Sequence, residues 1–559
     1  MRLGRRWVLL AAASLTLAGC AGDEPQTIKK AARGARPGGN LTVGITPPGS
    51  IEPSNAFEPM GQLVVRTMCD PLIDVDPVTG ELKPAIAESW QIHSDGRRIT
   101  LKLRKDVRFH NGEEVQADDV AFALSRVADR EYASAVAELL RPIAGFDEIH
   151  GEIDTDNEEL LERLAGVRPT EEYGLEIGLK EPNADFLRAL THPLASPIPK
   201  EEVLEDPDAF ERKPVCAGPY RLAEPWDPSK QSIKLERFRD YYGLNLAFTR
   251  GGRGYPDTIE FRVDRDPDSA LAAQQAGNSD LVRVPAARIA ENRPDPGFFQ
   301  APSATLEYLG LPVTTDAFAN SAVRVALSQA VNRQALVDAV FAGGRVPATG
   351  ILPPAAGDVF REGACAELVP PTGSVDSATA LLNEEGIQLG GTTMRLYFND
   401  EFNNRKVVEN VAAQWKAALG MNSELVAVGW DEYITRATGQ GGFDGPFRMS
   451  RAAPYASPDQ YLFPLFHSDS IGQENFTRFA SPTFDRLLER SARRAETLED
   501  LKVEYRRLEQ VACSRMPIVP LTFGSQEYVA SARTASAVET FADRTSGQPA
   551  IRELYVRAS

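Results

Sequence analysis

The stretch that decides the fold class is TMRLYFNDEFNNRKVVENVAAQWKAALGMNSELVAVG, residues 393–429. Its first part, residues 393–398, predicts a β-strand, and residues 424–429 predict a second one. Residues 404–419 between them predict an amphipathic helix. The apolar face of this helix carries Val407, Val411 and Trp415. Two strands joined by a helix form a βαβ unit, which favours a parallel sheet covered by helices. The sequence therefore predicts an α/β fold.

Further elements lie on the N-terminal side of this unit. Residues 321–341 predict one long helix with Ser321 as its N-cap. Residues 39–45 predict a short strand, and residues 99–109 begin with the alternation of apolar and polar residues that is typical of a half-buried strand. Another helix is expected from Ala117, where two aspartates occupy the first turn. We find no internal repeat.

The N-terminus has the features of an export signal. Residues 1–20 read MRLGRRWVLLAAASLTLAGC, in which three arginines precede an apolar stretch. That stretch is shorter than the roughly 20 apolar residues of a membrane-spanning helix. Leu17-Ala18-Gly19-Cys20 resembles a bacterial lipobox, which implies cleavage before Cys20 and attachment of diacylglycerol to its thiol. Residues 21–38 predict a flexible tether. Both general secretion and a twin-arginine route through Arg5-Arg6 remain open.

Composition agrees with an exported globular protein. The 559 residues carry a formal net charge of −18, and 42% of them are hydrophobic. An acidic chain is a poor partner for nucleic acid or for anionic lipid, so neither is expected as a ligand. A chain of this length exceeds what one hydrophobic core supports, so we expect two or three lobes.

Motifs for catalysis or metal binding are missing from the sequence. The five histidines are scattered, and no pair of them has the spacing of zinc ligands: they are His93, His110, His150, His192 and His467. Neither HExxH, GxSxG nor GxxxxGK[ST] occurs. We therefore expect neither an enzyme nor a cofactor or metal site.

Several segments in a fixed order resemble the dipeptide/oligopeptide/nickel family of extracellular solute-binding proteins. The opening segment is GGNLTVGITPPGSIEPSNAF, residues 38–57. The family signature is matched by PAIAESW at residues 84–90, FHNG at 109–112 and ADDV at 117–120. Two later matches are CAGPY at residues 216–220 and VRVALSQAVNR at 323–333. The resemblance covers nearly all of residues 39–559.

This resemblance implies a periplasmic-binding-protein type II fold, with two lobes, a hinge made of two crossings, and an extra subdomain in the N-terminal lobe. By alignment, lobe I holds residues 39–65, 186–300 and 525–559. The extra subdomain holds residues 66–185, and lobe II holds residues 301–524. Ligand would bind between the lobes, and closure would bury it.

The family resemblance also implies a function and a location. The chain is expected to be a monomeric lipoprotein of the periplasmic side of the membrane, held there by Cys20. It would capture a small ligand, peptide-like or related, and deliver it to the permease subunits of an ABC importer. Two alternatives are an anchored sensor or scaffold without a transport role, and an exported hydrolase, which the missing motifs disfavour.

The resemblance also points to ligand-contacting residues. Residues 428–462 resemble the second-lobe segment that lines the peptide cleft, where the family has tryptophan-x-alanine-aspartate-tyrosine. Arg451 stands for the tryptophan, Pro454 for the aspartate, and Tyr455 is retained. Without that aspartate, a ligand with a free amino terminus loses its counter-charge. The expected contacts are Phe57, Glu58, Tyr308, Trp430, Arg448, Arg451 and Tyr455. Alternatively, the two arginines face solvent or pair with Asp444 or Asp459, and Trp430 and Tyr308 fill the core.

Four cysteines remain besides Cys20, an even number for an oxidising compartment. On the lobe assignment that the resemblance implies, we predict disulfides between Cys69 and Cys216 in the first lobe and between Cys365 and Cys513 in the second. Pairing within a lobe leaves the hinge free to move.

Overall fold

The computed structural model describes residues 38–77, 79–151, 163–243, 256–494, 498–534, 542–543 and 546–556. The predicted export signal and Cys20 lie outside the described residues. Among the helices in these ranges, none has both the length and the apolar character needed to cross a bilayer.

The predicted βαβ unit is confirmed. Strand β14 (Thr393–Asn399) pairs in parallel with β15 (Asn422–Val428), and helix α15 (Asn404–Leu419) connects them. The predicted apolar face of α15 is buried, with Trp415 fully enclosed in the core. Burial of a continuous apolar stripe is what fixes an amphipathic helix against a sheet.

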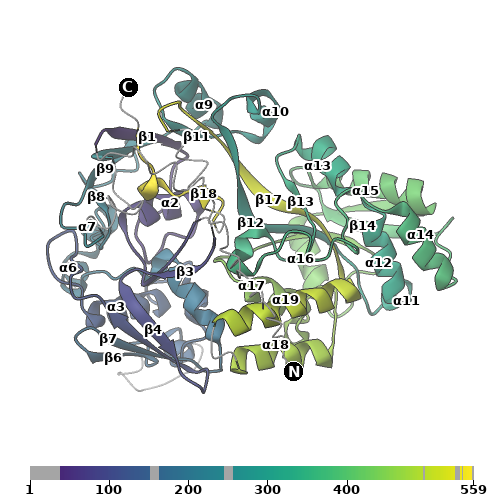
Figure 1. Ribbon diagram of the computed structural model, residues 1–559, viewed down its shortest axis with the longest axis horizontal. Coiled ribbons are helices and arrows are strands. Elements are labelled where there is room, and N and C mark those ends of the chain that lie inside the picture. The colour runs from purple at the N-terminus through teal and green to yellow at the C-terminus, as the bar shows by residue number, and fades with distance from the viewer. Residues whose placement is uncertain are drawn as a thin grey trace, which may run out of the picture.

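One mixed sheet runs through the described part of the chain, in the order β15-β14-β16-β12-β17-β11-β1-β10-β9-β8, with β13 added beside β17. Two long antiparallel strands, β12 (Phe298–Gly310) and β17 (Ile518–Ala530), stand at its centre and run from one half of the molecule into the other (Figure 1). The remaining strands are β1 (Asn40–Ile45), β8 (Tyr220–Leu222), β9 (Ser232–Arg237), β10 (Thr258–Val263), β11 (Leu281–Arg283), β13 (Val346–Pro347) and β16 (Phe447–Ala452).

The first lobe is built on β1, which pairs in parallel with both β10 and β11. Its apolar core joins residues that are far apart in the sequence, from Leu41 to Val556. The helices of this part are α2 (Pro59–Met68), α6 (Lys200–Glu205), α7 (Pro207–Arg212), α9 (Pro267–Gln275) and α10 (Ile289–Asn292). Short 3-10 turns are η4 (Ala286–Arg288) and η7 (Ile551–Glu553), and a small ribbon pairs β18 (Ala542–Asp543) with β19 (Gln548–Pro549).

An extra subdomain with a core of its own packs beside the first lobe. Its sheet has the order β4-β5-β7-β6. The elements are β2 (Ile73–Val75), β3 (Leu82–Pro84), β4 (Ala87–Ile92), β5 (Arg98–Leu103), β6 (Val167–Glu171), β7 (Gly174–Gly178), α3 (Ala117–Ala128), η1 (Ala137–Leu140) and α4 (Phe146–Ile149). The 3-10 turns that follow in the sequence, η2 (Ala184–Thr191) and η3 (Pro193–Ala195), contribute residues to the same core. The helix predicted from Ala117 is confirmed.

Helices surround β14, β15 and β16 in the second lobe. They are α11 (Asp316–Ala319), α12 (Ser321–Gln329), α13 (Arg333–Phe341), α14 (Val375–Glu384), α16 (Trp430–Thr438), α17 (Asp459–Phe466), α18 (Pro482–Arg494) and α19 (Leu498–Arg515), with the 3-10 turns η5 (Pro354–Val359) and η6 (Ser468–Ser470).

The prediction of one helix over residues 321–341 is wrong in one respect, since α12 and α13 are separate. Asn332 interrupts the helix because its side chain accepts the backbone N–H of Ala335 at 2.9 Å and so caps α13. The cap of α12 is Asn320, which accepts the N–H of Ala322, rather than Ser321.

Both predicted disulfides are confirmed. Cys69 is bonded to Cys216, and Cys365 is bonded to Cys513. The first bond lies in the core of the first lobe and the second in a core of the second lobe. Neither bond ties one lobe to the other.

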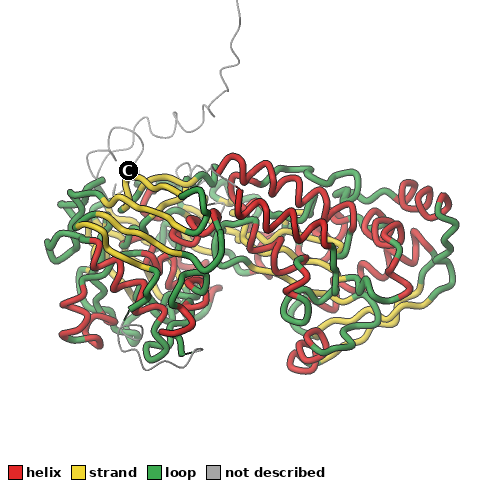
Figure 2. Tube along the Cα trace, turned by 90° about the horizontal axis from the view of Figure 1, so that it is seen from below, coloured by secondary structure: helices red, strands yellow, loops and turns green. Residues whose placement is uncertain are grey.

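The predicted α/β fold with two lobes is confirmed. Figure 2 shows the two bodies meeting along the central strands and diverging on one side. The pairing of β12 with β17 is irregular where the strands pass between the lobes, with register shifts between Pro302 and Leu306 and between Glu307 and Tyr308. A strand pair whose hydrogen-bond register is interrupted bends more easily than a regular pair, so this irregularity is consistent with a hinge.

Candidate functional site

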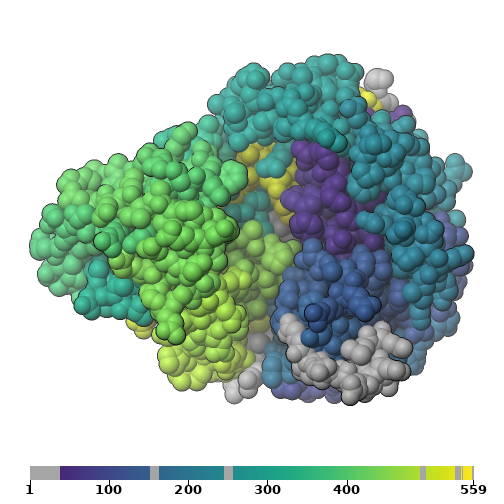
Figure 3. Space-filling view, turned by 180° about the vertical axis from the view of Figure 1, so that it is seen from behind, coloured from purple at the N-terminus to yellow at the C-terminus, as the bar shows by residue number. Residues whose placement is uncertain are grey.

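A cleft separates the two lobes. In the space-filling view of Figure 3, the surface is hollowed between the second lobe and the N-terminal segment of the first, with β17 visible in its floor. The cleft has a volume of about 830 Å³. Its walls come from the β11–α10 segment of the first lobe, the crossing strands β12 and β17, and the β14–α15 loop, α16 and β16 of the second lobe. Residues from both lobes and from the strands that cross between them therefore line the cleft.

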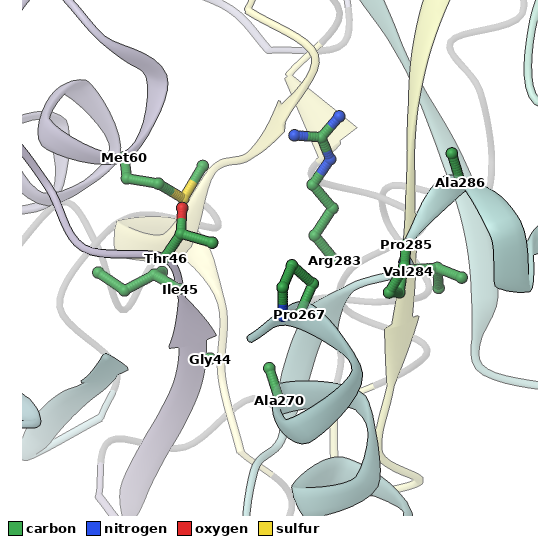
Figure 4. A pocket seen from close by; sticks show the side chains of 10 residues that line it. All are labelled: Gly44, Ile45, Thr46, Met60, Pro267, Ala270, Arg283, Val284, Pro285 and Ala286. Carbon is green, nitrogen blue, oxygen red and sulfur yellow. The ribbon is translucent and has the colours of Figure 1, made fainter. Parts of the chain in front are cut away.

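A smaller pocket of about 290 Å³ adjoins this cleft and shares Arg283 and Ala286 with it. It lies at the carboxyl ends of the parallel strands β1 and β11. Figure 4 shows the Arg283 side chain extending between Met60 and Thr46 on one side and Pro285 on the other. Ligands of open α/β sheets bind at the carboxyl ends of strands, so the position is typical of a binding site.

Two of the predicted contact residues, Trp430 and Arg448, line the cleft. Trp430 is the first residue of α16, is 47% exposed, and lies parallel to the ring of Tyr433. The guanidinium of Arg448 donates to one carboxylate oxygen of Glu307 at 2.6 and 2.9 Å. Glu307 is only 2% exposed. Arg448 is therefore committed to a buried ion pair, and its partner is not the Asp444 considered from the sequence.

Arg451 points to the other face of β16, since side chains alternate along a strand. Its Nε donates to the carbonyl of Gln460 at 2.8 Å, and its guanidinium pairs with Glu474. Tyr455 accepts a hydrogen bond from the side chain of Gln460 at 2.9 Å and packs against the subdomain core. Neither residue lines the cleft or its adjoining pocket.

Tyr308 fills the second-lobe core, where it is 1% exposed. Its burial raises the pKa of the phenol above the ordinary value, so the hydroxyl stays protonated. Tyr308 therefore lies in the core, as the alternative interpretation of the sequence expects.

Phe57 and Glu58 directly precede helix α2. Met60, the second residue of this helix, lines the adjoining pocket. The Phe57 side chain is 58% exposed. The Glu58 carboxylate caps α2, because it accepts the backbone N–H groups of Met60 and Gly61, each at 2.7 Å. It also accepts the N–H of Gly49 at 3.0 Å, so it holds the loop together.

The sequence analysis missed Phe402, Arg283, Arg345 and Lys406, all of which line the cleft. Phe402 is 98% exposed and has a backbone φ of +49°, which is unusual for a residue with a side chain. Phe402 lies in the loop directly after β14, and Lys406 lies in the first turn of α15, which follows that loop. The rule that ligands bind at the carboxyl ends of parallel strands could have pointed to it.

No group of three or more histidine, cysteine, aspartate or glutamate residues in the described ranges could hold a metal ion. Within the cleft, Glu307 pairs with Arg448 and accepts the Thr522 hydroxyl, and Glu527 accepts the Ser525 hydroxyl. The geometry is that of a two-lobed solute-binding protein.

Comparison with known proteins agrees with this class. Residues 81–473 match the model of the bacterial extracellular solute-binding proteins, family 5. Two relatives are the di/tripeptide-binding protein 3 of Pseudomonas aeruginosa, 26% identical over 78% of this chain and 80% of its own, and the heme-binding protein A of Haemophilus influenzae, 26% identical over 92% of each chain. Among solved structures, the unliganded open form of the periplasmic murein tripeptide binding protein MppA has a TM-score of 0.80 and 21% identity, over 92% of this chain and 97% of its own.

The chain belongs to family 5 of the bacterial extracellular solute-binding proteins. This family and the relatives found here are binding proteins for transport and not enzymes.

Proposed function

We propose that this protein is the substrate-binding lipoprotein of an ABC importer, which captures a small ligand between its lobes and delivers it to the membrane permease. The observation that carries the proposal is the cleft of about 830 Å³ whose walls belong to both lobes and whose floor is the hinge. Rotation about β12 and β17 would close the lobes on a ligand and change the surface offered to a permease. A monomer is sufficient for this cycle.

The proposed lobe boundaries follow the alignment given above. Lobe I comprises residues 39–65, 186–300 and 525–559, the extra subdomain residues 66–185, and lobe II residues 301–524. The positions of β12 and β17 support these boundaries, because each strand passes from one half of the sheet to the other.

We propose a peptide-like or related small molecule as ligand. Relatives carry names that refer to di- and tripeptides, to glutathione and to heme. Trp430 and Arg448 line the cleft and Phe57 stands near its adjoining pocket, so these three remain proposed contacts. Pro454, in the place of the family's aspartate, offers no counter-charge to an ammonium group. A ligand with a blocked or non-peptidic amino end is therefore favoured.

The proposal is tested by purifying the protein from its own cells, identifying co-purifying small molecules by mass spectrometry, and titrating each into ligand-free protein. We expect saturable binding without chemical change, a smaller radius of gyration in X-ray scattering, and loss of cellular uptake when the neighbouring permease is deleted. Uptake that continues without the permease, or binding that leaves the radius of gyration unchanged, would contradict it.

The anchor is tested separately. If Cys20 carries diacylglycerol, Cys20→Ser should move the protein from the membrane fraction to the soluble extracytoplasmic fraction. Two acyl chains anchor a protein stably and a single chain only marginally, so loss of both should release it almost completely. Cell fractionation with immunoblotting measures this, and the unchanged ligand affinity of the released protein is the control. If the variant stays entirely in the membrane fraction, the proposal that Cys20 is lipidated is wrong.

A further inference from the structure

The cleft brings together two exposed aromatic rings and three cationic side chains that form no ion pair within the described part of the chain. We infer that its ligand is an anion that carries a flat aromatic or conjugated ring. The cations are Arg283, Arg345 and Lys406, and the rings are Phe402 and Trp430. The inference rests on the proposed function and specifies the chemical class of the ligand.

Three carboxylates line the cleft, and each accepts at least one hydrogen bond from a neighbouring side chain. Glu307 accepts hydrogen bonds from Arg448 and from the Thr522 hydroxyl. Glu527 accepts from the Ser525 hydroxyl and from the side chain of Gln300. Glu401 accepts from the side-chain amide of Asn399 at 3.1 Å. Among the described residues, only Glu307 has a cationic partner, so Glu401 and Glu527 each keep a negative charge in the cleft.

The basic side chains of the cleft outnumber these acids. Among the described residues, no carboxylate lies within ion-pair distance of Arg283, Arg345 or Lys406, in contrast to Arg448. The Arg345 guanidinium lies over the ring of Phe341, 5.3 Å from the ring centroid. Guanidinium and ammonium groups bind carboxylate and phosphate through charge-assisted hydrogen bonds. The cleft lining holds four basic side chains and three carboxylates, so its net formal charge is positive and favours an anion.

The rings supply the apolar half of the site. Phe402 and Trp430 follow the neighbouring parallel strands β14 and β15. At 98% exposed, Phe402 contacts almost nothing else in the protein, and its left-handed backbone holds it in that position. One side of Trp430 lies toward Tyr433, with ring centroids 6.4 Å apart and an angle of 16° between the planes. Exposed apolar side chains beside a binding cleft mark a contact surface, and aromatic rings favour flat partners.

Closure gives the anion a further role. Arg283 belongs to the first lobe, whereas Arg345 and Lys406 belong to the second. Closing the empty cleft brings like charges toward one another, and this opposes closure. An anion between the lobes removes that repulsion, and the attraction strengthens as water leaves the cleft. Only a ligand of the right charge would then stabilise the closed form.

Three probes separate the ring from the charge. N-acetyltryptophan has both, its amide has the ring alone, and N-acetylaspartate has charge without a ring. Calorimetric titration and saturation-transfer NMR with the full-length protein should detect N-acetyltryptophan. We expect each of the other two probes to bind at least about tenfold more weakly, the usual effect of losing one charge-assisted hydrogen bond or one stacked ring.

Substitutions of cleft residues test whether the probes bind in the cleft. Arg283→Gln and Lys406→Gln should each weaken the binding of N-acetyltryptophan about tenfold and leave the binding of its amide unchanged. Phe402→Ala should weaken both ring-bearing probes. Lys213→Gln and Leu204→Ala are matched controls, since both side chains are exposed outside the cleft, and they should have no effect.

Three results would overturn the inference: equal binding of acid and amide, unchanged binding in Arg283→Gln together with Lys406→Gln, or no detectable binding of N-acetyltryptophan up to about 1 mM. The proposed transport function is judged independently by its permease-dependent uptake. A transported ligand that lacks a ring or a negative charge would leave that function standing and remove only the inference on ligand class.

Discussion

Glu509 of α19 is a buried carboxyl group that fixes a loop of the second lobe. One carboxyl oxygen accepts the backbone N–H groups of Ile351 and Leu352, at 3.0 and 2.9 Å. The other oxygen is buried without a hydrogen-bond partner among the described residues. Burial raises the pKa of Glu509 to about 7, although the two backbone hydrogen bonds oppose the rise.

This raised pKa predicts the pH dependence of stability. The unfolded chain loses the Glu509 proton near its ordinary pKa of 4.5, and the folded protein keeps it until about pH 7. The stabilisation is complete below pH 4.5 and is lost as the pH rises through 7, at about 1.4 kcal/mol per pH unit. Glu509→Gln imitates the protonated acid and should remove this slope. Urea denaturation at several pH values measures it, and an unchanged slope would show that Glu509 is ionised when folded.

The ion pair of Glu307 and Arg448 yields a second prediction for single residues. Arg448→Met should lower the free energy of unfolding by about 3–5 kcal/mol, because it leaves the Glu307 carboxylate buried without a countercharge. The double variant Glu307→Gln with Arg448→Met should recover much of this loss. Chemical denaturation of Arg448→Met, Glu307→Gln and the double variant completes the double-mutant cycle. If the two effects simply add, the two residues are not coupled.

At the scale of elements, Gly524 of β17 lies where the two crossing strands lose their register, opposite Ser303–Thr305 of β12. A Cβ at Gly524 would lie 2.9 Å from the Cβ of Thr305 and would also clash with the Ser303 hydroxyl. The absence of a side chain thus lets the strands approach closely at the hinge.

Gly524→Ala should therefore destabilise the protein by about 1–3 kcal/mol, the usual cost of overpacking. It should also weaken ligand binding, since the strands would be held apart at the point about which the lobes rotate. Gly441→Ala is the control, because a Cβ there meets no atom within 4 Å. Thermal unfolding and titration of the native ligand provide the two readouts. Equal behaviour of the two variants would exclude a special role for Gly524.

At the scale of the whole molecule, the lobes touch at a place besides the crossing strands. Arg188 of η2 donates to Asp358 of η5 at 2.7 Å and to Asp185 at 3.1 Å, and the Arg188 side chain is 2% exposed. Beside it, a Cβ at Gly80 would lie 2.6 Å from the Cα of Gly357, so two backbones pack together without side chains. This contact joins the segment around the extra subdomain to the second lobe.

Removal of the Arg188 charge should disturb both stability and lobe orientation. Arg188→Met leaves Asp185 without its guanidinium partner in the interior and should lower the free energy of unfolding by about 3–5 kcal/mol. The control is Arg97→Met, which breaks the exposed pair with Glu181 and should cost less than about 1 kcal/mol. Denaturation and X-ray scattering of the ligand-free variants measure stability and shape. Similar small losses in both variants would mean that the Arg188 contact does not hold the lobes.

The sequence by itself determined the elements whose signals are local. Residues 393–429 predicted β14, α15 and β15 because apolar periodicity is set by neighbours within a few positions. The order of the short family motifs predicted the two-lobed fold class. The lobe assignment then predicted both disulfides. The break at Asn332 was missed, because a single capping side chain competes with an otherwise continuous helical pattern.

The tertiary structure alone decided the contents of the cleft. Arg448 and Arg451 are three residues apart on β16, so the pleat sends them to opposite faces, and only Arg448 lines the cleft. Their partners, Glu307 and Glu474, are 141 and 23 residues away in the sequence. Arg283 and Phe402 meet the same cleft from different lobes because the strands before them end at it. Strand register and lobe packing create these juxtapositions, and neither leaves a signal in local sequence.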